Sequence, residues 1–489
     1  MDVRPAHPGW LGPWTYLGAP FVLALCLGLW GLPRQGSIWD DEAMTYDAAH
    51  RSLPGLFSLL RHNDLVHGAY YLLMHAVFRV HDGLWALRIP SVLAIAVAAS
   101  GVSLLGKRLA GPRAGLLAGL VFPLPPTVQW FEQDGRSYAI VAALVVWATL
   151  LLLRAVETGR TRTWAGYTVV TAASCVLHEF AVLALVAHGV TVLLCRVGGR
   201  ALRAWAVSAG VVVVVLTPFA TLSWRQADQI SWISTPGWAN LYDFPWLMAI
   251  GVVCSLVRPT PRERPRIVLW ALAVPMLLLP TALLILATFT VKPVYVDRYV
   301  LYSVIGFALP TGVALDAIWR LAERRTRRWA WLTAGGAGAA VIIGTVLVPP
   351  LRGQHTPAAR DNDLAAAARV VGHLDSPGDG VLFVPARLRL TAQLFPDRFA
   401  GVHDIALRNS ARSSGTRYGV ERSPKDIRLR ITAGTRVIVL ADDPPRGQPS
   451  DLLPSEQAKK AVGRAPFRVC TVRRVQGVRI TVFARPGFC

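Results

Sequence analysis

Eleven apolar segments, each near the length that crosses a bilayer, divide the first 350 residues of this chain. A transmembrane helix needs about 20 mostly apolar residues, so the pattern predicts a polytopic helical bundle. The whole chain is 53% hydrophobic and 16% charged, which excludes a water-soluble protein of this size. We place the spans near residues 14–33, 86–106, 113–128, 137–154, 163–178, 180–196, 204–222, 241–257, 267–290, 299–319 and 329–349.

The first span is predicted to remain in the mature protein, because residues 14–31 are long enough to cross and no clear small-residue cleavage site follows them. Residues 67–80 are also apolar, but 14 residues are short for a span and they include His75 and Arg79. We expect this stretch to form a juxtamembrane helix in the interface, within a long loop over 34–85.

Basic residues support this topology. If residues 67–80 do not cross, one set of loops carries 18 Lys and Arg residues, and the alternate short loops carry four. The positive-inside rule then makes the first set cytoplasmic, together with the N-terminus, and leaves loop 34–85 outside. The net charge of +22 is explained by this topology, so we expect the chain to lie in the cell membrane and to bind no nucleic acid.

Residues 351–489 have a different pattern. Long apolar runs give way to short segments typical of strands, with a helical pattern at Leu364–Leu374. We expect a small α/β domain, placed outside the membrane by the odd number of spans, after a membrane domain over 1–350. An oxidising compartment would permit a disulfide between Cys470 and Cys489, although two cysteines do not establish one. The strand-like segments are Val381–Val384, Arg436–Leu440, Arg468–Val472 and Val478–Phe483.

Polar residues from four separate loops meet on the inferred outer face. Acids are costly at membrane depth, so acids gathered beside a polytopic bundle are candidates for a functional site. A carboxylate can take a proton from an attacking hydroxyl, and arginines can stabilise a departing phosphate. The candidates are Asp40, Asp41, Glu42, Asp64, His67, Glu132, Asp134, Arg136, His178, Glu179, Asp297 and Arg298.

Several of these residues also have a structural interpretation. The acids at 40–42 are suited to cap a following helix, and Asp134 is suited to pair with Arg136. The sequence His178-Glu179 is equally well explained as a polar turn between two spans. Tyr70 and its neighbour Tyr71 fit an aromatic belt at the interface better than a stacking site for substrate. All of these residues are predicted to lie on the same side of the membrane, which favours the functional interpretation.

Five motifs, in order over residues 14–320, resemble the bacterial membrane glycosyltransferases of the GT-C fold. The resemblance is to the family 39-like branch, which is related to the protein mannosyltransferases and the aminoarabinose transferases of lipid A. It implies that a sugar, with mannose first and arabinose second, moves from a polyprenyl-phosphate donor to an acceptor at the outer face with inversion. The motifs are Ile38–Ala43, Asp64–Leu73, Ala86–Ser91, Asp134–Ala139 and Asp297–Tyr299.

The resemblance also implies roles for individual residues. Asp41 becomes the catalytic base and Glu42 a contact to substrate or acceptor, while Asp40 is an additional acid. Arg298 is assigned to the lipid phosphate. The sequence Asp134-Gly-Arg136-Ser-Tyr138 replaces a family motif that begins with Glu, and His67-Gly-Ala replaces His-Pro-Pro. The further residues expected to bind substrate are Asp40, Asp64, His67, Tyr70, Asp134, Arg136, Tyr138 and His178.

No spacing of His, Cys and Asp indicates a tight metal site, although the acids are able to hold a divalent cation. The expected partners are the lipid-linked donor, the bilayer, and an acceptor that is a glycan, a glycolipid or a protein. Two other functions are open: a transporter of lipid-linked saccharide, and a non-catalytic assembly subunit with the same fold. A transporter would carry charges at mid-span, whereas most of these spans have uncharged centres.

Overall fold

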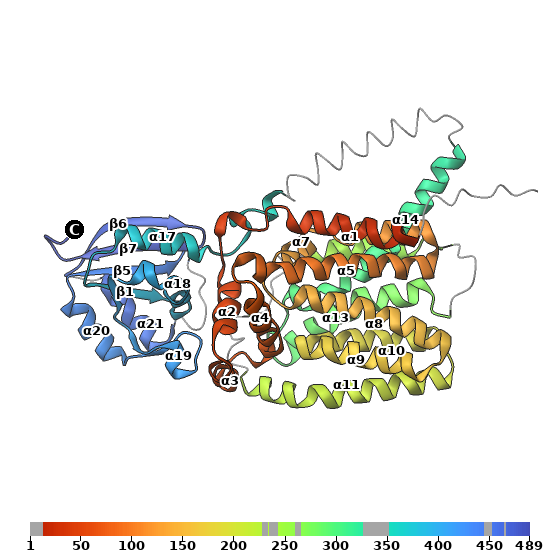
Figure 1. Ribbon diagram of the computed structural model, residues 1–489, viewed down its shortest axis with the longest axis horizontal. Helices are drawn as coiled ribbons and strands as arrows, with labels where there is room; N and C mark the ends of the chain where they lie inside the picture. Colours follow the sequence, from red (N-terminus) through yellow and green to blue (C-terminus); the bar gives the residue numbers. More distant parts are fainter. Residues whose placement is uncertain are drawn as a thin grey trace, which may run out of the picture.

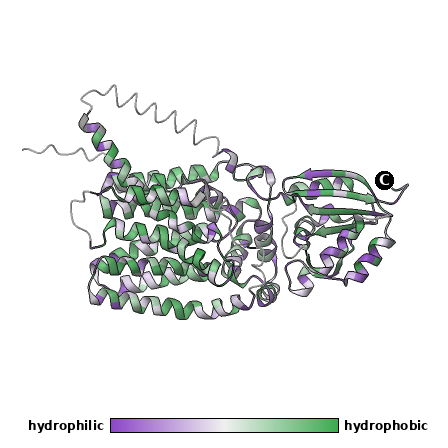
Figure 2. Cartoon of the chain, turned by 180° about the vertical axis from the view of Figure 1, so that it is seen from behind, coloured by the Kyte–Doolittle hydropathy of each residue, from purple (hydrophilic) through white to green (hydrophobic). Residues whose placement is uncertain are grey.

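The computed structural model describes residues 13–226, 233, 243–259, 266–325, 352–444, 452–463 and 466–489. A helical bundle, formed by residues up to 325, stands beside a C-terminal domain built on a five-stranded sheet (Figure 1). Hydrophobic residues dominate the bundle helices, and hydrophilic residues are more frequent on the C-terminal domain (Figure 2). The predicted fold class, a polytopic helical bundle followed by a small α/β domain, is therefore confirmed.

Ten of the predicted spans coincide with helical segments of the bundle. Six described helices are long and apolar enough to cross a membrane, or seven if the bent pair α6 and α7 counts as one span. The predicted span at 329–349 lies outside the described residues. The bundle helices are α1 (Pro13–Leu29), α5 (Leu84–Ala110), α6 (Pro112–Val121), α7 (Pro126–Glu132), α8 (Tyr138–Thr158), α9 (Thr161–Leu177), α10 (Val182–Leu194), α11 (Gly199–Arg225), α12 (Asp243–Ser255), α13 (Leu269–Thr290) and α14 (Val304–Arg325).

The third predicted span, 113–128, is not one straight helix. Helix α6 ends at Val121, and α7 begins at Pro126 after a bend of 67°. Pro123, Pro125 and Pro126 explain the break, because proline lacks a backbone donor and disfavours helical geometry in the residue before it. The bend leads the chain through α7 into the loop at 133–137, which carries part of the candidate site.

Small residues allow the bundle helices to approach closely. A Cβ atom at Gly115 of α6 would lie 2.3 Å from the backbone nitrogen of Lys107 on α5. A Cβ atom at Gly312 of α14 would lie 2.5 Å from the backbone nitrogen of Ala118 on α6. Helices in membranes gain much of their stability from this kind of close packing, and here it joins α5, α6 and α14.

Three helices from the segment 34–85 lie across one end of the bundle, between it and the C-terminal domain (Figure 1). They are α2 (Asp40–His50), α3 (Leu53–His62) and α4 (Gly68–Val80). The interfacial helix predicted at 67–80 corresponds to α4, whose 13 residues run across the direction of the bundle helices. We call this end of the bundle the domain-facing end.

The C-terminal domain has a mixed sheet with strand order β2-β1-β5-β7-β6. Strands β2, β1 and β5 are parallel, and β7 and β6 are antiparallel to their neighbours. All four strands predicted from sequence are present, and the predicted helix at 364–374 is α17 (Leu364–Leu374). The bounds are β1 (Asp379–Val384), α18 (Leu390–Leu394), β2 (Val402–Asp404), β3 (Leu407–Asn409), α19 (Ala411–Ser414), β4 (Val420–Glu421), α20 (Pro424–Ala433), β5 (Arg436–Asp442), α21 (Pro454–Lys459), β6 (Arg468–Val475) and β7 (Val478–Ala484).

One hydrophobic core joins the C-terminal domain to the domain-facing end. Side chains alternate between the two faces of a strand, so Val381 and Phe383 of β1 face one side while Leu382 faces the other. The first face packs with α17 and also with Met44 of α2 and Tyr70 of α4 in a single buried cluster. The other face packs with α20 and α21. The domain is therefore attached to the bundle by buried apolar contacts as well as by the chain connection.

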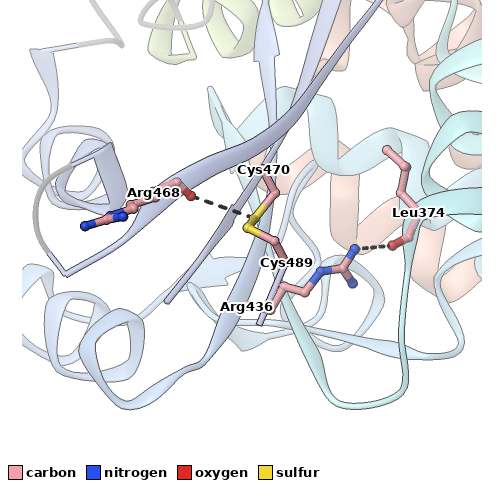
Figure 3. The surroundings of a disulfide bond; sticks show 5 residues. All are labelled: Leu374, Arg436, Arg468, Cys470 and Cys489. Carbon is pink, nitrogen blue, oxygen red and sulfur yellow. Dashed lines mark hydrogen bonds between the residues drawn. A yellow bond between two sulfur atoms is a disulfide. The ribbon is translucent and has the colours of Figure 1, made fainter. Parts of the chain in front are cut away.

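The disulfide considered from sequence is present. Cys470 of β6 is bonded to Cys489 near the end of the chain (Figure 3). Cys26, Cys175, Cys195 and Cys254 are free. A bond between two residues 19 positions apart secures the final segment against the edge strand of the sheet.

We expect maleimide labelling of the denatured protein to modify four thiols without reduction and six after reduction, because two of the six cysteines are bonded. The measurement is intact mass after labelling. Six modified thiols in unreduced protein from the native host would contradict the disulfide. The variant Cys26→Ser is the control and should lower both numbers by one.

Candidate active site

The candidate site forms where α2 begins. Trp39 precedes the helix in an extended conformation, and Asp40, Asp41 and Glu42 occupy its first turn. Acids in this position are stabilised by the unpaired amides and the positive end of the helix dipole. Because successive helical residues point about 100° apart, the three neighbouring carboxylates face three different environments.

Asp41 faces two arginines from distant parts of the chain. Its Oδ1 atom lies 3.3 Å from Nη2 of Arg136, and its Oδ2 atom lies 3.6 Å from Nη2 of Arg298. The carboxylate is 23% exposed, and Oδ2 accepts no hydrogen bond from any described residue. One carboxylate between two guanidiniums leaves the local charge positive. The arrangement suits a general base beside a group that binds an anion.

Aromatic rings surround these charges. His178 lies 4.7 Å from the ring of Tyr299, 5.4 Å from that of Tyr138 and 6.0 Å from that of His67, measured between centroids. The guanidinium of Arg298 lies 5.8 Å from the centre of the Tyr138 ring. Burial lowers the pKa of His178 to about 3, and the nearby Arg298 and Arg136 act in the same direction. His178 is therefore neutral at pH 7.

Glu42 does not face this space. Its carboxylate is fully buried, 2.6 Å from Nη2 of Arg34 and 2.8 Å from Nε of Arg88. Burial alone would raise the pKa of Glu42, but Arg34 and Arg88 outweigh burial and lower it to about 2. The sequence interpretation made Glu42 a contact to substrate, whereas the structure encloses it in an ion-pair network. We therefore interpret Glu42 as a residue that positions Asp41.

Two further predicted binding residues lie behind the site. Asp134 is fully buried and accepts a hydrogen bond of 3.0 Å from Nε1 of Trp39. Burial, and then the neighbouring Glu42, raise the pKa of Asp134 to about 6. Tyr70 is also fully buried, within the core shared with the C-terminal domain. Tyr70 is therefore not part of an exposed aromatic belt at the interface, because its side chain is fully buried.

Asp40 and Asp64 face the C-terminal domain. Asp40 pairs with Arg387 at 3.2 Å, and Asp64 accepts a hydrogen bond of 2.8 Å from Arg417. Burial would raise the pKa of Asp64, but Arg417 outweighs it, so the pKa falls below its usual range. Glu132, expected on the surface, is buried against α1 near Gly28.

An apolar cavity of about 370 Å³ opens beside the site. Leu216 and Ala220 of α11 and Ala287 of α13 form part of its wall. Its polar side chains include His178 and Lys292. Tyr299 also lines the cavity and borders Arg298, whose guanidinium lies 5.9 Å from the centre of the Tyr299 ring. His178 and Tyr299 therefore lie between the apolar wall of the cavity and Arg298, which is close to both rings.

Several residues of the site were missed from the sequence because their partners are distant in it. Tyr71 was noticed only as an aromatic, and Arg34 was not considered. A lysine between two spans gives no local signal of a binding role, yet Nζ of Lys292 lies 4.2 Å from the ring centre of Trp224 at the cavity. The other residues without a predicted role are Arg88, Tyr299, Arg387 and Arg417.

A metal site has no support in the part of the chain that the structure describes. No three His, Cys, Asp or Glu side chains there are grouped so that they could hold an ion. The acids of the domain-facing end are paired with arginines instead: Asp40, Asp41, Glu42 and Asp64 each have one within 4 Å.

Comparisons with known proteins identify the fold. Residues 66–224 match the family model of dolichyl-phosphate-mannose-protein mannosyltransferase. Crystal structures of ArnT from Cupriavidus metallidurans, one bound to undecaprenyl phosphate and one in the apo state, match with a TM-score of 0.53 and 13% identity. These matches cover 96% of this chain and 98% and 97% of the ArnT chains.

Arabinosyltransferase EmbB from Mycobacterium smegmatis matches with a TM-score of 0.43 and 18% identity, over 64% of this chain and 31% of that one. No curated protein sequence matches the chain. The resemblance to membrane glycosyltransferases of the GT-C fold, indicated by the sequence motifs, is confirmed by the family model and by the fold shared with ArnT.

We expect Glu42→Gln to destabilise the protein by about 3–5 kcal/mol, because it leaves two buried guanidiniums without their carboxylate. The measurement is the midpoint of thermal unfolding in detergent. Asp41→Asn is the matched control at the next position and should change the midpoint much less, since Asp41 is partly exposed. Equal midpoints for Glu42→Gln and the wild type would contradict the structural role of Glu42.

Proposed function

We propose that this chain, a multi-pass membrane protein with the GT-C fold, transfers a sugar from a polyprenyl-phosphate donor to an acceptor hydroxyl. The observation that carries the proposal is the position of Asp41 between Arg136 and Arg298, next to an apolar cavity. A base, an anion-binding pair and a space for a lipid are the three parts that such a transfer needs. The family model over 66–224 and the ArnT structure with undecaprenyl phosphate support a lipid-linked donor.

The proposed reaction is a single displacement. The carboxylate of Asp41 takes the proton of the acceptor hydroxyl while the hydroxyl oxygen forms a bond to the anomeric carbon. The bond from the anomeric carbon to the phosphate oxygen breaks, and the polyprenyl phosphate departs with the bonding electrons. Attack opposite the leaving group inverts the anomeric configuration.

The two arginines would stabilise the phosphate as its charge increases. Guanidinium groups bind phosphate oxygens through paired hydrogen bonds and remain charged at any physiological pH. Arg298 is adjacent in sequence to Tyr299, which is part of the cavity wall, and its guanidinium lies 5.9 Å from the centre of that ring. The prenyl chain would lie along α11 and α13, and Lys292 would add a second positive charge near the same cavity.

A transporter of lipid-linked saccharide is supported less well. Transport sites usually lie near the bilayer midplane and carry polar or charged groups there. In the described membrane-spanning helices most ionised side chains lie near the ends, such as Arg88 at the start of α5 and Arg154 near the end of α8, and the ion pair of Asp316 with Arg320 lies in the second half of α14. The acids of the candidate site and their arginine partners lie at the domain-facing end, where a reaction with an acceptor is possible.

The proposed sugar is mannose, in keeping with the family model. The domain-facing end would face the outside of the cell, with the N-terminus in the cytoplasm, because the basic loops lie at the opposite end. The disulfide between Cys470 and Cys489 supports this orientation, since such bonds form in oxidising compartments. A glycan, a glycolipid or a protein hydroxyl would be the acceptor.

We expect Asp41→Asn to reduce transfer about 10²–10⁴-fold, the usual contribution of a general base. The measurement is transfer of radiolabelled mannose from polyprenyl-phosphate mannose in membranes that contain the native acceptors. Asp82→Asn is the control, because Asp82 is an exposed acid of the same loop, and it should keep full activity. Full transfer by Asp41→Asn would remove the catalytic assignment. Movement of the donor across vesicles without transfer would favour a transporter.

We expect Ala220→Trp to raise the KM for the lipid donor several-fold with a smaller change in kcat, because the indole would fill the apolar cavity that Ala220 lines. The control is Val214→Trp, since Val214 lies on the same helix but is 73% exposed. An unchanged KM in Ala220→Trp would place the prenyl chain elsewhere.

A further inference from the structure

We infer that Arg417 of the C-terminal domain is a positioning residue for the catalytic site, acting on Asp41 through Asp64, Tyr71 and Arg136. This inference rests on the proposed function and extends it. It gives the C-terminal domain a part in the reaction, although the domain supplies no group to the reacting atoms.

A continuous series of polar contacts carries the inference. Nη2 of Arg417 donates to Oδ1 of Asp64 at 2.8 Å, and the hydroxyl of Tyr71 donates to Oδ2 of Asp64 at 2.6 Å. Nη1 of Arg136 donates to the same hydroxyl at 3.2 Å, and Nη2 of Arg136 lies 3.3 Å from Oδ1 of Asp41. Four contacts therefore lead from the C-terminal domain to the proposed base.

Burial makes these contacts strong. The side chains of Asp64 and Arg136 are 3% and 6% exposed, and Tyr71 is fully buried. Charges interact more strongly where water is excluded, and a buried charge without a partner is costly. Asp64 also has a left-handed backbone conformation with φ of 67°, which is unfavourable for most residues other than glycine. The surrounding contacts must offset that cost.

The segment that carries Arg417 is held firmly against the bundle end. Nη2 of Arg51 donates to the carbonyl of Thr416 at 2.9 Å, and the same guanidinium is anchored by Asp47 at 2.7 Å. A Cβ atom at Gly415 would lie 2.3 Å from Oγ of Ser58, so this backbone lies directly against α3. The position of Arg417 therefore depends on how the domain sits on α2 and α3.

The physical effect is a competition for Arg136. This guanidinium lies between two acids, Asp41 directly and Asp64 through the Tyr71 hydroxyl. While Arg417 offsets the charge of Asp64, Arg136 remains available to Asp41. Without Arg417, the buried charge of Asp64 attracts Arg136 more strongly and draws it away from the base. A displacement of about 1 Å in a catalytic group can slow a reaction on the order of 10²-fold.

The test compares Arg417→Gln with the wild type in the polyprenyl-phosphate mannose assay. We expect kcat to fall at least about tenfold, and the KM for the donor to rise as well, because Arg136 is also proposed to bind the donor phosphate. Tyr71→Phe, which removes a single oxygen from the series, should have a similar effect. The double variant should be no slower than the slower single variant, since both changes break one series of contacts. Arg417→Lys should restore part of the rate.

Arg436→Gln is the matched control. Arg436 forms an ion pair with Asp379 in the same domain. Asp379 begins strand β1, whereas the loop that carries Arg387 follows the other end of the strand, at Val384. It should unfold at a lower temperature with kcat unchanged. If Arg436→Gln slows the reaction equally, or if the Arg417 and Tyr71 losses multiply, Arg417 acts only through stability and the inference fails.

A measurement of ligand binding, which needs no sugar transfer, makes the test independent of which sugar the enzyme transfers. Binding of undecaprenyl phosphate alone, measured by quenching of tryptophan fluorescence, should weaken in Arg136→Gln and Arg298→Gln but remain near the wild-type value in Arg436→Gln. Arg417→Gln should weaken binding in the same direction as Arg136→Gln, because it draws Arg136 away. No transfer by the wild type would refute the proposed function, whereas wild-type binding by Arg417→Gln with full transfer would refute the positioning role.

Discussion

The ion-pair network around Glu42 is the interaction on which the site depends. Its carboxylate joins Arg34, which follows the first span, to Arg88 at the start of α5. Arg88 also donates to the carbonyls of Leu32 and Ser37, and Arg34 donates to that of Gln133. Three segments of backbone are thereby fixed around one buried charge. Removing Glu42 would leave both buried guanidiniums without their carboxylate, so the network depends on this one acid.

This network sets the direction of the neighbouring carboxylate. Because Glu42 is fixed inward in the first turn of α2, Asp41 must project about 100° away from it, where it meets Arg136 and Arg298. A carboxylate on an isolated helix end would rotate freely among solvated positions. In this protein the fold already restricts the orientation of the Asp41 side chain, so little of its conformational entropy remains to be lost when the substrates bind. Such pre-orientation of reacting groups contributes to catalysis in enzymes.

The C-terminal domain is an extension of the same structure. Its sheet shares a hydrophobic core with α2 and α4, and its arginines Arg387 and Arg417 pair with acids at the bundle end. The sequence suggested a boundary at residue 350, because the long apolar runs stop there. The stabilising contacts cross that boundary, since the segment 34–85 packs against both the helical bundle and the C-terminal domain.

The sequence by itself determined the fold class, ten helical segments of the bundle and four of the seven strands in the described residues, and it drew attention to the acids and arginines of the candidate site. The length of an apolar segment and the alternation of apolar and polar residues are local properties of a sequence, and burial in lipid or in a sheet requires them directly. The acids and arginines were noticeable because charged residues are rare in such a chain. Tertiary structure alone decided which acid meets Arg136 and Arg298 and which is enclosed with Arg34 and Arg88. Glu42 and Asp41 are adjacent and chemically similar, yet their partners lie 46 and 95 residues further along, at Arg88 and Arg136. Such pairings follow from helix packing, and no local pattern encodes them.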